Sequence, residues 1–448
     1  MASHDAKVKK ILEAVKEKDI HFVKFQFTDI LGILKSFAVP ASELEVAMDE
    51  GMGFDGSSIM GYTPIEESDM IAMPDLDTFQ ILPWRPREGG VARLICDIKL
   101  PEGGPFEGDP RYVLRRAVKE AEKKGFQYNL GPELEYFYFK TMDSPELIDR
   151  GGYFDSLPLD LAEDLRRETI LTLEEMGIMV EYSHHEVSAS QHEIDLCYAD
   201  ALSMADYAIT YRLVVKAIAQ KLGVFASFMP KPIYGVNGSG MHTHQSLFDL
   251  KTKKNAFYDA DDPDGWYLSD TAKYFIAGQL KYAKEITGIL AQWVNSYKRL
   301  VPGYEAPVYV SWARRNRSAL IRVPLYKPGK ESATRAEYRA PDPACNQYLA
   351  FAVMLMAGLA GIENKEKLPK PIERDIFHLT REERRDLGIT ELPGSLADAI
   401  KEIEGSELMR RTLGEHTYEN WLKIKKDEWD DYRIQVHKWE LDKYLHLL

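Results

Sequence analysis

Residues 101–140 read PEGGPFEGDPRYVLRRAVKEAEKKGFQYNLGPELEYFYFK, and this stretch divides the chain into two unlike parts. Its first ten residues are rich in Gly and Pro, a composition typical of a domain junction. Before the junction the sequence holds short extended runs, whereas after it helix-like and strand-like segments alternate. We therefore predict an N-terminal domain over residues 1–104 and a larger domain over residues 105–448.

The junction leads into a well-marked helix. Asp109 suits the N-cap, Pro110 the first helical position and Gly125 the C-terminal stop. Further helices are expected over residues 161–176 and 201–222, each followed by a glycine. Several strand-like segments carry residues of different character at alternate positions, as half-buried antiparallel strands do.

The composition excludes several classes of protein. The chain has 448 residues, of which 45% are hydrophobic and 29% charged, a mixture typical of globular proteins. Its formal net charge of −14 argues against nucleic-acid binding as the main function. The longest nearly apolar run, residues 348–362, is shorter than the ~20 residues of a membrane-spanning helix, so we expect a buried helix and no membrane partner. The polar N-terminus and three widely spaced cysteines favour a cytoplasmic protein without a secretion signal.

Two acids mark the strand that follows the first helix. In the segment GPELEYFYFK, Glu133 and Glu135 are two residues apart and point to the same face of a strand. Neighbouring carboxylates repel one another unless a positive charge lies between them. The segment is either part of a cation site or a solvent-facing strand edge, and alone it does not decide between the two.

More acids and histidines occur over residues 180–196, VEYSHHEVSASQHEIDL. A turn signal between Glu186 and Glu193 would fold the segment so that both carboxylates face one point. A simple polar hairpin is the alternative here.

Residues 234–249, YGVNGSGMHTHQSLFD, combine a glycine-rich loop with a strand. Gly238 and Gly240 allow the backbone to approach a ligand closely. His242, His244 and Ser246 then share one face of the strand, which favours a ligand-binding role over a purely structural one.

Residues 295–324 carry six basic side chains and one acid, Glu305, a local excess of +5 in an acidic protein. The planar guanidinium groups of its arginines suit phosphate and carboxylate. The stretch VPGYEAPVY around Glu305 is loop-like, and we predict a lid there. In ATRAEYRAPDP, Arg335, Glu337 and Arg339 alternate along one strand face, which alone favours a structural salt bridge.

Together these segments supply carboxylates, one or two imidazoles and several arginines. Oxygen ligands with at most one histidine suit Mg²⁺ or Mn²⁺ better than zinc. Metals combined with arginines are typical of phosphoryl transfer. The sequence has no G-x-x-x-x-G-K-[ST] motif, so an ATP-type nucleotide must be held in another way. The acceptor of the phosphoryl group stays open at this point.

The same motifs resemble type I glutamine synthetase, in particular its shorter, alpha branch. The resemblance rests on FDGSSI at residues 54–59, GPELEYF, the HHEV and QHEI pair, NGSGMHTHQSL, KRLVPGYEAPV with RRNRSALIRVP, and RAEYRAPDPACN. It spans almost the whole chain. It implies an α+β protein with an N-terminal β-grasp-like domain and a catalytic domain whose curved antiparallel sheet is flanked by helices. It also implies a dodecamer of two hexameric rings with active sites between subunits.

The family resemblance implies a reaction. Glutamate–ammonia ligases join ammonia to the γ-carboxylate of L-glutamate with ATP as co-substrate, through γ-glutamyl phosphate. The resemblance assigns one divalent ion (Mg²⁺ or Mn²⁺) to Glu135, Glu186 and Glu193, and the other to Glu133, His242 and Glu337. Catalytic roles fall on Asp55, from a neighbouring subunit, and on Glu305, Arg317 and Arg339. Glutamate-binding positions are Asn237, Gly238, Arg299, Glu305, Arg317 and Arg339. Nucleotide-binding positions are Glu181, Tyr198, His244, Ser246, Arg317, Arg322 and Arg335.

Two departures from family patterns bear on regulation. Phe377 stands where one branch carries a tyrosine that is adenylylated, so this control is not expected. The stretch GYTPIEESDM lacks the arginine that mediates glutamine feedback in the shorter branch, which puts that feedback in doubt. The resemblance allows a nitrogen-regulatory protein as a partner. It also predicts that the C-terminal helix, with Leu441, Leu445 and Leu448 on one face, reaches into the opposite ring.

Two alternatives to glutamine synthesis stay open. One is a γ-glutamyl ligase of the same fold that uses an organic amine, which loss of the acidic ammonium-site residues would favour. The other is a non-catalytic binding or regulatory relative, which missing metal ligands or arginines would favour. Neither loss is seen in the sequence.

Overall fold

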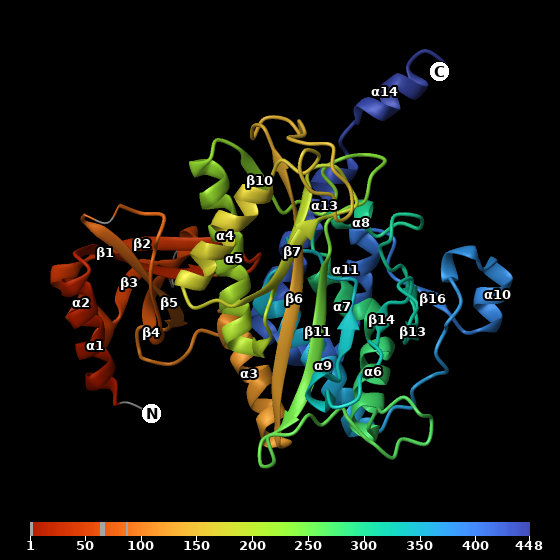
Figure 1. Ribbon diagram of the computed structural model, residues 1–448, viewed down its shortest axis with the longest axis horizontal. Helices are drawn as coiled ribbons and strands as arrows, with labels where there is room; N and C mark the ends of the chain where they lie inside the picture. The colour runs from red at the N-terminus through yellow and green to blue at the C-terminus, as the bar shows by residue number, and fades with distance from the viewer. Residues whose placement is uncertain (1–2, 63–67, 87) are drawn as a thin grey trace.

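The computed structural model describes residues 3–62, 68–86 and 88–448. Within those ranges the chain forms two large sheets, each with its own hydrophobic core. The N-terminal sheet lies to one side of the molecule, and the long strands of the second sheet run through its centre (Figure 1). Residues 63–67, the part of the segment GYTPIEESDM on which the feedback prediction rests, lie outside the described residues.

The N-terminal sheet has the strand order β2-β1-β5-β4-β3 over the described residues, and β1 and β5 are parallel while the other pairs are antiparallel. Two helices pack on it. This arrangement agrees with the expected β-grasp-like domain. The bounds are α1 (His4–Glu17), β1 (Ile20–Thr28), β2 (Leu34–Pro40), α2 (Leu44–Glu50), β3 (Met52–Asp55), β4 (Asp69–Ile81) and β5 (Gly90–Lys99).

The larger sheet is curved and mainly antiparallel, with the order β13-β14-β15-β11-β6-β8-β7 in the described part of the chain. Short strands β9 and β10 pair with β6. Its strands are β6 (Phe126–Phe139), β7 (Val180–His185), β8 (Gln191–Leu196), β9 (Ala199–Asp200), β10 (Phe225–Ser227), β11 (Met241–Asp249), β13 (Trp312–Ala313), β14 (Ile321–Arg322) and β15 (Ala336–Tyr338). A separate pair joins β12 (Tyr309–Val310) to β16 (Thr390–Glu391).

Helices flank this sheet, as expected for an α+β fold (Figure 1). The apolar run predicted to be a buried helix forms α9, and its first fifteen residues are buried. The helices are α3 (Pro110–Lys123), α4 (Glu163–Glu175), α5 (Ala201–Lys221), α6 (Asp270–Lys281), α7 (Ala283–Leu290), α8 (Ser296–Arg299), α9 (Gln347–Asn364), α10 (Arg381–Asp386), α11 (Leu396–Glu404), α12 (Glu407–Leu413), α13 (Glu415–Arg433) and α14 (Lys438–Tyr444). No helix in the described ranges has both the length and the apolar character needed to cross a membrane.

The predicted signals at the ends of α3 are confirmed. Asp109 Oδ1 accepts a hydrogen bond from the N–H of Arg111, and Gly125 has a φ of +87° just after the helix. The Arg111 side chain then joins the N-terminal sheet to helix α5, because it pairs with Asp75 on β4 and with Asp206 on α5, each at 2.8 Å. Helix α3 thereby ties the N-terminal sheet to the helices that flank the larger sheet.

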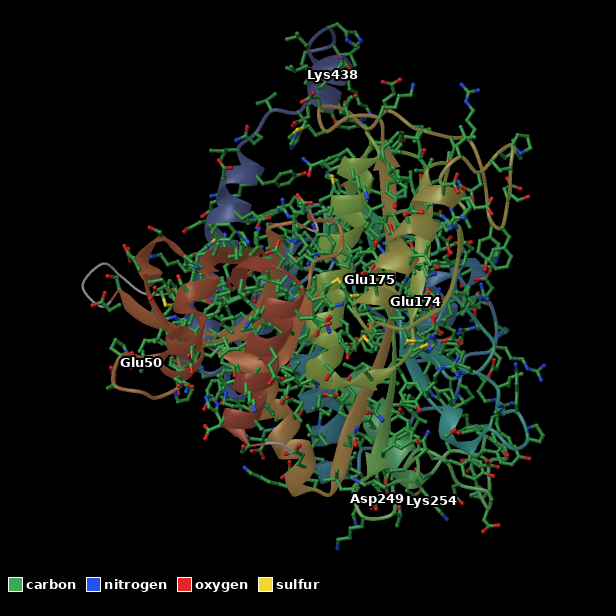
Figure 2. The ribbon with its side chains drawn as sticks, turned by 60° about the vertical axis from the view of Figure 1, so that its left-hand side comes forward. Glu50, Glu174, Glu175, Asp249, Lys254 and Lys438 are labelled. Atoms are coloured by element: carbon green, nitrogen blue, oxygen red, sulfur yellow. The ribbon has the colours of Figure 1, made fainter. Side chains whose placement is uncertain are left out.

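One element stands apart from the rest. Helix α14 projects from the end of α13, and its first residue, Lys438, lies clear of the body in the turned view of Figure 2. Leu441, Leu445 and Leu448 are all exposed in the single chain.

Candidate active site

A cavity of about 530 Å³ opens on one face of the curved sheet. Strands β6, β8, β11 and β15 supply four of its acids and His242, while His184 lies on β7 and Glu186 directly follows that strand. Loops around residues 237–240, 304–306 and 316–318 form its walls. Residues far apart in sequence meet here because neighbouring strands place them opposite each other. Of the predicted positions, the cavity is lined by Glu133, Glu135, Glu186, Glu193, Asn237, Gly238, His242, Arg299, Glu305, Arg317, Arg322, Glu337 and Arg339.

One group of three possible metal ligands matches the predicted set. Glu133 on β6 is the cross-strand partner of His242 on β11, and Glu337 on β15 completes the group. His242 Nδ1 lies 3.5 Å from Glu133 Oε2 and 3.8 Å from Glu337 Oε1. One ligand atom from each residue lies within 4.8 Å of the others. Because β6 is paired on both sides, the alternative of a solvent-facing edge strand is wrong.

A second group forms at the β7–β8 hairpin. The turn brings Glu186 and Glu193 together, as predicted, and the third member is His184, whose Nε2 lies 3.1 Å from Glu193 Oε2. Glu135 on β6 lies opposite Glu193 on β8. Glu135 Oε2 accepts hydrogen bonds from the Gln191 side chain and the Gly240 N–H. The place of Glu135 in a metal set therefore stays a prediction.

The electrostatics of this second group favour a cation. Burial, reinforced by the charge of Glu186, raises the pKa of Glu135 to about 8. Burial and the charges of Asp195 and Glu135 raise the pKa of Glu193 well above its ordinary value. Among the described residues, Glu193 Oε1 is buried without a hydrogen-bond partner. A positive charge placed among these carboxylates would relieve both the repulsion and the unsatisfied oxygen.

Arginines surround Glu337. Arg322 and Arg339 both form ion pairs with its carboxylate. Although burial opposes ionisation, Arg339 and the nearby histidines hold the pKa of Glu337 at about 2. The expected salt bridge in this segment is thus present, but Arg335 is not part of it: its Nε donates to His244 Nδ1 at 3.1 Å.

The glycine-rich loop approaches a buried arginine. A Cβ atom at Gly240 would lie 2.6 Å from an Arg299 guanidinium nitrogen, and one at Gly238 would lie 2.3 Å from the Pro230 carbonyl oxygen. Arg299 itself is anchored, because it donates to the carbonyl oxygens of Ala340 and Arg339 at 2.7 and 3.1 Å. Only glycine leaves room for this packing.

The predicted lid is an irregular loop that ends where β12 begins. Glu305 adopts a φ of +59°, a left-handed conformation that is uncommon outside glycine. Asn237 Nδ2 donates to Glu305 Oε2 at 3.1 Å, so the lid contacts the glycine-rich loop. The exposed Arg317 lies on the opposite loop of the cavity.

Six predicted positions do not line this cavity: Asp55, Glu181, Tyr198, His244, Ser246 and Arg335. His244 touches its edge, with Nε2 2.7 Å from Glu133 Oε1, and Ser246 lies one step farther along the same face of β11. Tyr198 is 65% exposed and stacks near Phe248. The exposed Asp55 ends β3 in the N-terminal sheet.

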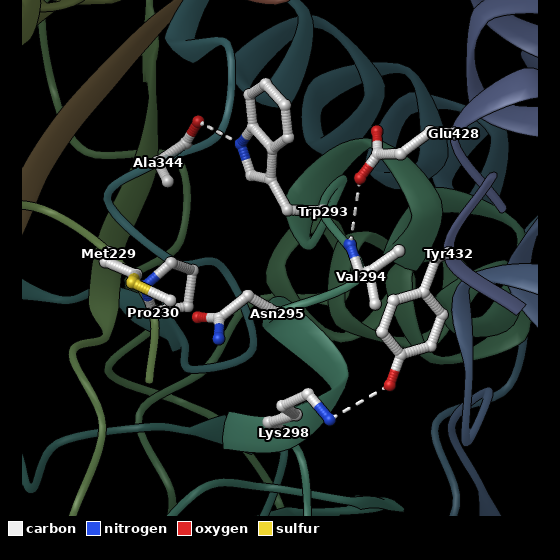
Figure 3. Close-up of a pocket in the computed structure, with 9 residues that line it drawn as sticks. All are labelled: Met229, Pro230, Trp293, Val294, Asn295, Lys298, Ala344, Glu428 and Tyr432. Carbon is white, nitrogen blue, oxygen red and sulfur yellow. Dashed lines mark hydrogen bonds between the residues drawn. The ribbon is translucent and has the colours of Figure 1, made fainter. Parts of the chain in front are cut away.

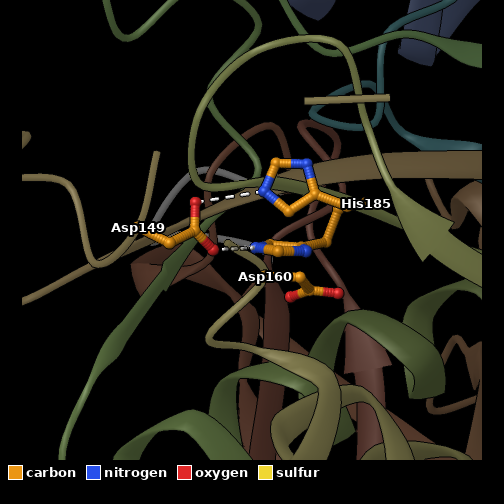
Figure 4. A group of neighbouring side chains, drawn as sticks. Asp149, Asp160 and His185 are labelled. Carbon is orange, nitrogen blue, oxygen red and sulfur yellow. Dashed lines mark hydrogen bonds and ion pairs between the residues drawn. The ribbon is translucent and has the colours of Figure 1, made fainter. Parts of the chain in front are cut away.

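A buried network supports the β7–β8 hairpin from behind. Asp149 Oδ1 lies 3.0 Å from His185 Nε2, and Asp160 lies beside them (Figure 4). Arg166 pairs with Asp160 at 2.6 Å and contacts His192 Nδ1 at 2.9 Å. Although these acids and histidines are grouped closely enough for a metal, the Arg166 guanidinium already supplies the positive charge. The network is therefore a structural support for its neighbours, Glu186 and Glu193.

Sequence reasoning gave no role to three residues of the site region, although His184 was noted in its motif. His184 lies two residues before Glu186, and Asp195 lies two residues after Glu193 opposite Glu133, so alternation along the strands could have found both. Burial and the charge of Glu133 raise the pKa of Asp195 to about 8. Lys231, beside the lid, had no sequence signal.

Comparison with known proteins settles the family. The glutamine synthetase catalytic domain matches residues 107–444, and the glutamine synthetase β-grasp domain matches residues 19–101. The chain belongs to the glutamine synthetase family. It is 55% identical to a glutamine synthetase from Methanosarcina mazei, over 98% of this chain and 97% of that one. It is 49% identical to one from Thermotoga maritima, over 98% of this chain and all of that one.

A solved structure described as a GmaS/ADP complex has the same fold. Its TM-score is 0.87 at 30% identity, with 97% of this chain and 99% of that chain covered. Membership of the glutamine synthetase family confirms the expected fold and an ATP-dependent ligase that makes glutamine. The family also implies ATP and a divalent metal, and the acidic and histidine groups of the cavity fit such an ion.

Proposed function

We propose that this cavity joins ammonia to L-glutamate through γ-glutamyl phosphate, with the roles of individual residues as the family resemblance assigns them. The observation that carries the proposal is the meeting of two groups of three metal-ligand side chains in one cavity with arginines. Full-length likeness to enzymes named glutamine synthetase favours ammonia over an organic amine as acceptor.

Glu133, His242 and Glu337 would hold one divalent ion, Mg²⁺ or Mn²⁺, and Glu135, Glu186 and Glu193 the other. The grouping of ligand atoms supports the first set and the pairing of Glu186 with Glu193 in the second. The raised pKa values of Glu135 and Glu193 support a cation beside them. His184 lies close enough to join the second set. When bound, such ions neutralise charge on the nucleotide phosphates.

The glutamate side of the cavity is assigned to Asn237, Gly238, Arg299, Glu305, Arg317 and Arg339. Arg317 and Arg339 would offset charge on the transferred phosphoryl group while the γ-carboxylate attacks the terminal phosphate of ATP. Glu305 would close the lid and exclude water, because an acyl phosphate hydrolyses readily. The contact between Asn237 and Glu305 supports a lid that responds to bound glutamate.

We assign the nucleotide to a band along β11 and its neighbours, formed by Glu181, Tyr198, His244, Ser246, Arg317, Arg322 and Arg335. His244, Ser246 and Arg335 continue the cavity away from the first metal group, which supports a nucleotide whose phosphates point toward Glu133 and Glu337. The exposed ring of Tyr198 is available to stack on a base.

Asp55 would bind ammonium and remove its proton in the cavity of a neighbouring subunit. Its exposed position outside the cavity of its own chain supports an assembly with shared sites, and we propose the dodecamer of two hexameric rings. We also propose a domain boundary between residues 104 and 105. Three free cysteines support a cytoplasmic location, and a nitrogen-regulatory protein is a proposed partner.

Glutamine formation and Mn²⁺ binding test the proposal together. Purified protein supplied with ATP, glutamate and ammonium should form glutamine, and Mn²⁺ titration should find two sites per chain. Glu337→Gln should lose one metal site and most activity, while Glu122→Gln, a change at an exposed position on α3, should keep both metal sites and full activity. Glutamine formation without metal, or turnover only with an organic amine, would overturn the proposal.

A further inference from the structure

Lys231 lies where the lid meets the glycine-rich loop. It is 9% exposed, and its Nζ is 3.9 Å from the centre of the Tyr304 ring. The same Nζ donates a hydrogen bond to the backbone oxygen of Val236. Tyr304 directly precedes Glu305, and Val236 directly precedes Asn237. One ammonium group thus contacts the neighbours of two residues that we assign to substrate.

The backbone of Lys231 is fixed separately. Asn295 Oδ1 accepts from the Lys231 N–H at 2.8 Å, and Asn295 Nδ2 donates to the Lys231 carbonyl at 3.0 Å. Asn295 directly precedes α8, the short helix that carries Arg299. Asn295 and Lys298 also line a second cavity, where Lys298 Nζ donates a hydrogen bond to the Tyr432 hydroxyl at 3.1 Å (Figure 3). The base of Lys231 is therefore tied to the rigid body, and only its tip engages the lid.

The cation and the ring suit each other. A lysine ammonium over an aromatic face is stabilised most when the pair is desolvated, and Lys231 is largely buried. Lys231 has no carboxylate within ion-pair distance among the described residues. Its charge is therefore directed to the Tyr304 ring and the Val236 carbonyl, so loss of the charge would release both segments.

We propose that Lys231 is a positioning residue that couples closure of the lid to the glutamate-binding loop. The inference rests on the proposed function of the cavity. With the coupling intact, the lid that carries Glu305 closes while Asn237 and Gly238 hold the substrate glutamate. Without it, water reaches γ-glutamyl phosphate, adds to the acyl phosphate and returns glutamate and inorganic phosphate, so ATP is consumed without forming glutamine.

The test compares phosphate release with glutamine formation in Lys231→Met, which keeps the length of the side chain and removes its charge. We expect a KM for glutamate raised about tenfold and a several-fold excess of phosphate over glutamine at low ammonium. Lys231→Arg keeps a cation over the ring and should restore most of the coupling. Tyr304→Leu should reproduce the defect, and the double variant Lys231→Met/Tyr304→Leu should be little worse than either single one.

Lys281→Met is the matched control, because Lys281 also lies over a tyrosine ring, at 5.5 Å, but on α6 and outside the cavity. It should release phosphate and glutamine in equal amounts. If the wild-type protein makes no glutamine from ammonia, the proposed function fails and the inference with it. If the wild type is coupled and both Lys231→Met and Tyr304→Leu stay coupled with an unchanged KM, the inference alone is wrong. Should Lys231→Met fail to fold, Tyr304→Leu decides.

Discussion

Two carboxylates on one strand show how strongly the pKa of a side chain depends on its neighbours. Glu133 and Glu135 both lie on β6 and face the same cavity. Burial opposes ionisation of each, yet His244 and His242 hold the pKa of Glu133 well below its ordinary value, while the charge of Glu186 helps to raise that of Glu135 to about 8. Neighbouring acids can therefore differ in charge at neutral pH until a cation joins them.

The close packing around Gly240 gives a prediction for a single residue. Gly240→Ala would place a methyl group 2.6 Å from the anchored Arg299 and 3.1 Å from His242 Nε2. We expect kcat/KM to fall about a hundredfold or more, because small misplacements of binding groups have effects of this size. Gly405→Ala is the control, since a Cβ there meets nothing within 4 Å. Steady-state kinetics that are equal for both variants would contradict the role of Gly240.

At the level of elements, the β7–β8 hairpin depends on the buried network behind it. Arg166→Met would leave Asp160, which is 1% exposed, without its ion-pair partner. Removing one partner of a buried pair costs about 3–5 kcal/mol of unfolding free energy. Urea unfolding should show this loss, and Mn²⁺ titration should show weaker binding because Glu186 and Glu193 lose support.

The adjacent Arg167 offers a matched control for this experiment. Its side chain is 62% exposed and pairs only with its neighbour Glu168 in the described part of the chain. Arg167→Met should change neither unfolding nor metal binding measurably. If both arginine variants behave alike, the buried network does not support the metal site.

The first turn of α3 makes stability depend on pH. Asp109 accepts hydrogen bonds from the N–H groups of Arg111 and Ile98, and burial together with the charge of Asp97 raises its pKa to about 7. The folded chain thus binds this proton more tightly than the unfolded chain does. Its contribution to stability is fully present below about pH 4 and is lost as pH rises from there to about 7, by up to about 4 kcal/mol.

Asp109→Asn removes this titration. The unfolding free energy of the variant, measured in urea at several pH values between 5 and 8, should fall less steeply with rising pH than that of the wild type. Parallel curves for the two proteins would show that Asp109 does not titrate in this range.

The sequence predicted the secondary-structure elements better than the contacts between side chains in the site. The grouping of Glu133, His242 and Glu337 was implied by the family resemblance and not by any local pattern. Caps and glycine stops located α3 to within a residue or two, and alternation placed Glu133 and Glu135 on one face of a strand. These signals are local, so a single sequence contains them. The role of Lys231 could not be predicted from the sequence, because its two partners, Tyr304 and Val236, lie on separate loops that meet only through tertiary packing. The pairing of Glu337 with Arg322 rather than Arg335 depends on the register of β14 and β15, which spacing does not determine.

At the scale of the whole molecule, α14 projects away from the body of the single chain (Figure 1). Trp439, Leu441, Leu445 and Leu448 are all at least 46% exposed, an apolar surface that favours association. Truncation after residue 433 should leave the fold of each subunit intact and shift the particle mass from that of two rings to that of one. Mass photometry checks this, and an unchanged mass would show that α14 does not join the rings.

The position of Asp55 has a genetic consequence. If the Asp55 carboxylate acts in the active site of the neighbouring subunit, the Asp55→Ala chain and the Glu305→Ala chain are each inactive alone. When the two chains are co-expressed, they complement one another in mixed oligomers. Random mixing would restore about a quarter of the catalytic centres, because each needs an intact lid and an intact neighbour. Two defective alleles would then support growth together where neither does so singly.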